Sequence, residues 1–162
     1  MDENIMARNL TLAARLREVL LNGHWIANTN IKEQVLSVDW KQATLQIYKL
    51  NTIAALTYHL NYYLFGLLSA LKTGRLEISD KFSFDHPVIT SKEDWEKLVS
   101  EFVNNGLEFS NFIEQSDETF FDQPFIDEKY GTIQRNIEGV IEHSYYHLGQ
   151  ISLIRKIILQ NQ

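Results

Sequence analysis

The apolar residues of this chain recur at the three- and four-residue steps of amphipathic helices, and the alternation typical of strands is nearly absent. One such stretch covers residues 5–22 and is followed by Gly23, a typical helix end. A second covers residues 52–72, where Asn51 is the expected N-cap and Gly74 the expected stop. Each stretch therefore predicts a long helix.

Two more long helices are predicted in the second half of the chain. Ser91 with Asp94 three residues later forms a capping-box pattern, and the apolar spacing that follows continues to Ile113. The last helix is expected over residues 132–159. The segments 75–90 and 116–131 lack sustained periodicity and hold both prolines, so they are expected to be irregular connections.

Shorter helical signals lie between the first two long helices. Asn30, with Glu33 three residues later, predicts a capped helix over residues 31–36. Asp39 predicts a cap for a helix over residues 40–47. Together these features predict an all-α fold, a four-helix bundle with a long, partly helical connector between helices one and two. At 162 residues, a single domain over residues 1–162 is expected.

Composition and charge limit the ligands that the chain can bind and the kinds of metal site that it can form. The chain has no cysteine, so any metal site must use nitrogen and oxygen ligands. Fifteen basic residues against 21 acidic ones give a net charge of −6, and no basic stripe suggests nucleic-acid binding. No apolar run is long enough for a membrane span, and no signal-peptide pattern opens the chain. We therefore expect a cytoplasmic protein that binds neither nucleic acid nor membrane.

Candidate metal ligands appear in the last helix. His143 and His147 are four residues apart, a spacing that places both imidazoles on one helix face. Asn136, Gly139 and Gln150 share that face, which is polar and small where a core-facing stripe would normally be aliphatic. Buried imidazoles without partners are costly, so a metal ion bound between them is one explanation.

A third histidine, His59, lies in the second long helix. Tyr63 shares its face, and the small residues Ala55 and Gly66 leave space beside the ring. Gly139 does the same on the last helix, which suggests a cavity in the core. Three neutral imidazoles leave a position open on Zn²⁺ or a similar ion, as in reactive metal sites. The alternative is that His143 and His147 are core or helix-surface histidines that bind no metal.

The other candidates carry simpler interpretations. His24 is expected to be a solvated loop residue and His86 a structural or exposed one. No glutamate stands between His143 and His147, so the zinc-peptidase pattern is not met. Tyr63, Glu142 and Gln150 are weak candidates for catalysis: Gln150 as a partner of a metal ligand, Glu142 as a solvated charge or proton carrier, and Tyr63 as a cavity-lining residue.

The chain resembles the DinB/YfiT-like superfamily of metal-dependent enzymes, which is unrelated to the DNA polymerase of similar name. The resemblance rests on three segments: Tyr58-His59-Leu60-Asn61-Tyr62-Tyr63, the run from His143 to Gln150 that reads His-Ser-Tyr-Tyr-His-Leu-Gly-Gln, and the connector over residues 25–51. It implies a four-helix bundle in which His59, His143 and His147 bind zinc or nickel, with water completing the coordination. It also implies frequent homodimers.

The predicted function is that of a metal-dependent transferase or hydrolase. A water molecule or a low-molecular-weight thiol bound at the open position of the ion would be activated to attack a small-molecule electrophile. The thiol is an expectation from the resemblance. The segments around Trp25 and residues 82–86 are expected to form the mouth. A non-catalytic metal-binding or stress-response bundle is the alternative, and a helical dimerisation module with vestigial histidines is a third.

Overall fold

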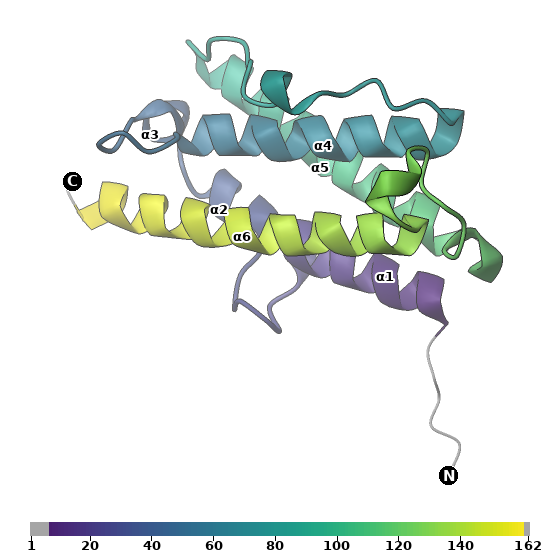
Figure 1. Cartoon of the computed structure of the whole chain (residues 1–162). Coiled ribbons are helices and arrows are strands. Elements are labelled where there is room, and N and C mark those ends of the chain that lie inside the picture. The colour runs from purple at the N-terminus through teal and green to yellow at the C-terminus, as the bar shows by residue number, and fades with distance from the viewer. Residues whose placement is uncertain (1–6, 161–162) are drawn as a thin grey trace.

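The computed structural model describes residues 7–160, and regular secondary structure in that part of the chain is helical (Figure 1). An isolated antiparallel bridge between Pro124 and Thr132 is the one β-type pairing within these described residues. The fold is thus all-α, as predicted. The α-helices are α1 (Arg8–Arg17), α2 (Ile31–Leu36), α3 (Trp40–Thr44), α4 (Ile53–Thr73), α5 (Lys92–Glu114) and α6 (Ile133–Gln160).

The predicted helix starts agree with the structure where the capping side chain is local. Asn30 accepts a hydrogen bond from the backbone N–H of Glu33 at 2.9 Å and caps α2. Ser91 and Asp94 form the reciprocal capping box of α5. One cap differs from the prediction: α4 is capped by Thr52, whose hydroxyl accepts from the N–H of Ala55, and not by the preceding asparagine.

Two predicted helix ends also need correction. The helix predicted over residues 40–47 ends at Thr44, whose hydroxyl bonds back to the carbonyl of Trp40, a competing bond that weakens helix propagation. The first helix changes at its end to a π-helical turn, Glu18–Asn22, closed by a bond from the N–H of Gly23 to the carbonyl of Glu18. Any side chain at position 23 would collide with Glu18. The predicted start at Ile5 lies outside the described residues.

The longer helices pack in a cyclic order around one core. Helix α5 packs against α1 and α4, and α6 packs against the same two helices. Figure 1 shows α4 and α6 side by side and running in opposite directions. The largest fully buried side chains come from all of these helices and include Leu16, Leu60, Phe102, Phe109 and Ile137.

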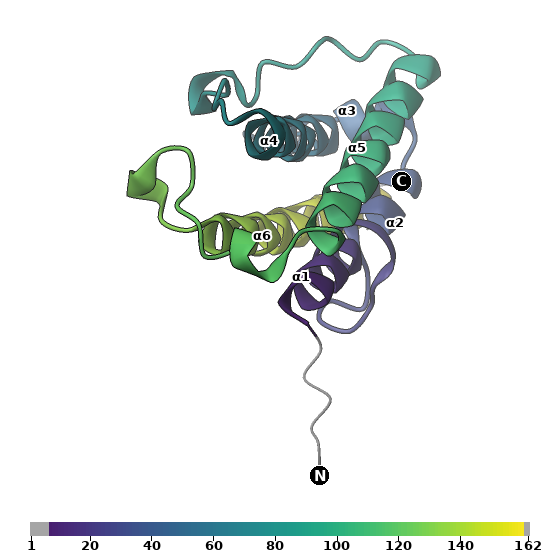
Figure 2. The same cartoon turned by 90° about the vertical axis from the view of Figure 1, so that its right-hand side faces the viewer.

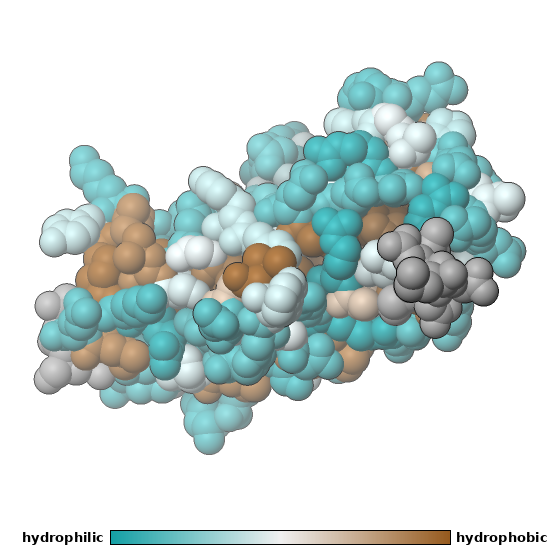
Figure 3. Space-filling view, turned by 90° about the horizontal axis from the view of Figure 1, so that it is seen from below, coloured by the Kyte–Doolittle hydropathy of each residue, from teal (hydrophilic) through white to brown (hydrophobic). Residues whose placement is uncertain are grey.

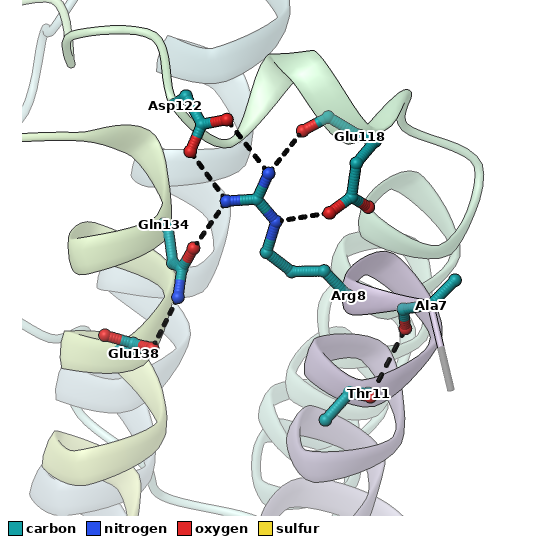
Figure 4. Close-up of polar contacts among 7 residues, drawn as sticks. All are labelled: Ala7, Arg8, Thr11, Glu118, Asp122, Gln134 and Glu138. Carbon is teal, nitrogen blue, oxygen red and sulfur yellow. Dashed lines mark hydrogen bonds and ion pairs between the residues drawn. The ribbon is translucent and has the colours of Figure 1, made fainter. Parts of the chain in front are cut away.

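Two irregular connectors complete the molecule. The first joins α4 to α5, and the second joins α5 to α6; in Figure 2 the first passes over α4 to reach α5, and the second loops out beside the start of α6. Arg8 of α1 anchors the second connector. Its guanidinium donates to Glu118 and Asp122 of the connector and to Gln134 of α6 (Figure 4).

The surface has no extensive apolar band on the face seen in Figure 3, where hydrophilic residues surround separate hydrophobic areas. Within residues 7–160, no helix combines the length and apolar character that crossing a membrane requires.

Candidate metal centre

The three predicted ligand residues meet between α4 and α6. His59 comes from the second turn of α4, and His143 and His147 come from successive turns of α6. The Nε2 atom of His143 lies 3.1 Å from Nε2 of His59 and 2.9 Å from Nε2 of His147. One ring nitrogen of each of the three histidines lies within 4.8 Å of the others. Helical periodicity therefore brings together the three rings that the sequence singled out.

Burial keeps these rings neutral. His59 and His147 are each 5 % exposed. Burial, followed by the neighbouring rings of His147 and His59, lowers the pKa of His143 to about 4. Burial is also the main cause that lowers the pKa of His59 and of His147. Neutral imidazoles are the form that binds a metal ion.

A hydrogen bond sets the orientation of the His147 ring. Its Nδ1 lies 2.6 Å from Oε1 of Gln150, one turn further along α6. The amide oxygen can only accept, so the proton of His147 is on Nδ1 and the lone pair of Nε2 points at the other two rings. Gln150 thus contacts a candidate ligand, the position proposed for it from the sequence.

The first connector holds the His59 ring from its other side. Phe84 stacks on this imidazole with centroids 4.1 Å apart and planes 11° apart. The Nδ1 atom of His59 is buried without a hydrogen-bond partner among the described residues, although the backbone of Ser83 lies close enough to raise the pKa of the ring. The ring is therefore positioned mainly by packing, and Phe84 is a site residue that sequence reasoning placed only within a segment at the mouth.

A tyrosine and an aspartate border the cluster. The Tyr63 ring lies edge-on to His59 and His143, with centroids 5.1 and 5.4 Å away. Its hydroxyl donates to Oδ1 of Asp80 at 2.6 Å. Burial and this bond raise the pKa of Tyr63 to about 12, so the hydroxyl keeps its proton. Asp80 was missed from the sequence, because nothing in the irregular connector marks which carboxylate returns to α4.

A cavity of about 500 Å³ opens beside the cluster, and its lining includes His143, Tyr63 and Asp80. Gly139 contributes to the wall, and a Cβ atom built there would have nothing within 4 Å. The sequence expectation of space next to Gly139 agrees with this geometry. The same expectation for Gly66 is wrong, because Ile78 of the first connector packs so closely on that glycine that any Cβ would collide with it.

The remaining candidates lie apart from the three rings. Glu142 is on the surface and pairs with Arg135 at 3.1 Å. His24 pairs with Glu33, and His86 bonds the carbonyl of its neighbour Pro87. Trp25 is 86 % exposed and does not line the cavity, so the first connector, and not the Trp25 loop, borders the site.

The donor set fits a divalent ion. Four-coordinate zinc with bonds of 2.0–2.1 Å places its ligand nitrogens ~3.3 Å apart, close to the two distances from Nε2 of His143 to Nε2 of His59 and of His147. Three imidazoles leave a coordination position for a further molecule. Comparison of the chain with protein-family models, with curated proteins and with solved structures finds no match.

Proposed function

We propose that the chain is a metal-dependent enzyme in which His59, His143 and His147 hold a divalent cation, zinc or nickel. The observation that supports this is the convergence of three neutral imidazoles from two helices, with Nε2 of His143 within 3.1 Å of Nε2 of both other rings. The resemblance to DinB/YfiT-like proteins agrees with it. Under this proposal, α1, α4, α5 and α6 form the four-helix bundle of that family.

When bound, a divalent cation lowers the pKa of a coordinated water or thiol and so supplies a nucleophile near neutral pH. The chain's own residues orient the histidines that would hold the cation. Gln150 fixes the tautomer of His147, and Phe84 holds His59 by stacking. Because there is no cysteine, a thiol nucleophile would enter as a cosubstrate, through the cavity that His143 borders.

Asp80 is the acidic group best placed to assist. It accepts a hydrogen bond from Tyr63 through Oδ1, which leaves Oδ2 available at the cavity wall. A proton released from the nucleophile at the cavity can pass to this carboxylate, whereas Glu142 is held outside by Arg135. We therefore assign Asp80 rather than Glu142 to proton transfer.

The second candidate function is a metal-binding protein without catalysis. One observation favours it: among the described residues, no carboxylate makes a hydrogen bond with any of the three histidines. Enzymes with histidine-bound zinc commonly have such an acidic partner.

The two functions are separated by activity of the loaded protein. Protein purified without a histidine tag and loaded with zinc or nickel is offered thiols paired with electrophiles, and then esters and amides. We expect turnover in at least one reaction class, abolished in His143→Ala and retained in His24→Ala, whose ring pairs with Glu33 instead. Stoichiometric metal without turnover would favour the binding protein. Absence of metal binding would contradict both.

A further inference from the structure

The walls of the cavity beside His143 are mostly apolar. Leu67 and Ile78 contribute from α4 and the first connector, and Phe125 and Val140 contribute from the second connector and α6. A volume of about 500 Å³ lies within the range of small-molecule sites. Apolar walls of this kind favour a ligand with an apolar body, because burial of that body is the main source of affinity.

Charged groups lie at separate places on the lining. Asp80 is next to the histidine cluster through Tyr63, whereas Arg135 belongs to the first turn of α6. Arg135 begins two turns before His143, and its exposed guanidinium reaches along α6 to the surface carboxylate of Glu142. The positive charge therefore lies at the exposed edge of the cavity, whereas His59 and His147 are buried.

Arg135 is available for an anion from the ligand. Both of its terminal nitrogens bond the same oxygen of Glu142, at 3.1 Å, and the two side chains are 57 % and 60 % exposed. Exposed pairs of this kind contribute little stability, so the planar guanidinium can take a ligand carboxylate, sulfonate or phosphate. At the other end Asp80 disfavours an anion, which fixes the direction of binding.

We propose that this cavity binds an elongated amphipathic anion, with its apolar body between the walls, its acidic group on Arg135 and its reactive end beside His143. The role of the reactive end rests on the proposed function. Binding of the body and of the acidic group does not, because it requires only the cavity and Arg135.

Gly139 offers a way to close the cavity without touching the histidines. Nothing lies within 4 Å of a Cβ at this position, so Gly139→Leu would place its side chain in the space that the ligand needs. Gly149 is a matched control. It lies on the same helix, a Cβ there also has nothing within 4 Å, and it lines a different surface hollow.

The probes are straight-chain alkyl sulfonates and the alcohols of the same length, titrated calorimetrically into zinc-loaded full-length protein. Sulfonates are poor zinc ligands, so their binding reports on the cavity and not on the metal. We expect affinity to rise by up to about fourfold for each added methylene. We also expect sulfonates to bind two- to fivefold more tightly than alcohols, the range of an exposed ion pair.

Each variant tests one part of the proposal. Gly139→Leu should weaken binding at least tenfold and keep its zinc, whereas Gly149→Leu should bind as the wild type does. Arg135→Gln should remove the preference for sulfonate over alcohol, and Lys156→Gln, the same charge change on an exposed part of α6, should not. Unchanged affinity in Gly139→Leu, or no dependence on chain length, would overturn the cavity assignment. A sulfonate preference that persists in Arg135→Gln would overturn the anion site.

Failure of the proposed function would look different. A wild-type protein that binds no zinc contradicts the metal centre, while the same titrations on that protein still decide whether the cavity takes amphipathic anions.

Discussion

The contact between α1 and α5 and the contact between α4 and α6 are both made by amphipathic helices, but they differ in how closely their side chains pack. In the first contact, which the π-helical turn after α1 continues, a Cβ at Gly106 would already touch Leu21 at 3.4 Å and Leu20 at 3.6 Å, and Phe102 and Phe109 of α5 are fully buried. Between α4 and α6 lie three histidines and an open cavity. The first contact leaves little free space beside Gly106, whereas the second contains an open cavity.

This difference shows where the molecule gains stability and where it gives stability up. Aliphatic and aromatic side chains on α5 supply the apolar burial that holds the fold. The facing stripes of α4 and α6 bury three polar imidazoles instead, with Nε2 of His143 within 3.1 Å of Nε2 of both His59 and His147. Departures from good packing of this kind are expected at functional sites.

The largest expected change in stability comes from a substitution in the core beside α5. Phe102→Ala should lower the free energy of unfolding by about 3–5 kcal/mol, because it leaves a cavity in a fully buried part of the core. His143→Ala, measured in metal-free protein, should cost about 1 kcal/mol or less, because it only enlarges an existing opening. Urea unfolding monitored by circular dichroism gives both values, and equal costs would contradict the comparison.

The next effect concerns the metal centre alone. Gln150→Leu should weaken zinc binding by about 10- to 100-fold, because His147 loses the acceptor that fixes its tautomer. Gln160→Leu, the same substitution at the exposed end of α6, is the control. Competition with a chromogenic chelator measures the affinity. If both variants bind zinc as tightly as the wild type, Gln150 has no part in the site.

Matched glycine substitutions compare the two contacts directly. Gly106→Leu should destabilise the protein by about 1–3 kcal/mol, because the new side chain must displace Leu20 and Leu21. Gly139→Leu should instead stabilise it by about 0.5–1 kcal/mol, since helix propensity improves and the cavity accepts the side chain. Thermal unfolding of the two variants would show shifts of opposite sign, and shifts of the same sign would refute the difference in packing.

The smallest expected effect is the pH dependence of the metal-free protein. The pKa of His143 is lowered to about 4 from 6.5, so the unfolded chain takes up protons at a higher pH than the folded one. Stability should therefore be full above pH 6.5 and fall as the pH drops toward 4. Solvent screening of the half-buried ring reduces the size of this fall.

The control for that measurement is a variant with His59→Gln, His143→Gln and His147→Gln together. Carboxylates elsewhere in the chain titrate in the same range and remain in the variant. Its stability curve should be flatter than that of the wild type between pH 6.5 and 4, and identical slopes would show that the histidines do not contribute.

Features with local causes could be predicted from the sequence. Asn30 and Ser91 cap their helices through atoms three residues away, so the pattern alone identified them. His143 and His147 were placed on one face by helical periodicity, and His59 could be matched to them because its own helix has the same regularity.

Features that depend on irregular segments could not be predicted in the same way. Phe84 and Asp80 reach the site through the connector after α4, whose path no periodicity defines. The same connector fills the space at Gly66 with Ile78, whereas the space at Gly139 stays open. A small residue in the sequence indicates that something can approach, and only the tertiary structure shows whether a side chain or a ligand does so.

The most direct test of the account is an anomalous-scattering map from crystals of the untagged protein grown with zinc, with data collected above and below the zinc edge. The account predicts one peak per chain, about 2.0–2.1 Å from Nε2 of His59, His143 and His147 together, present only above the edge. A zinc peak elsewhere on the chain, or three histidine rings that lie together with no peak between them, would contradict it.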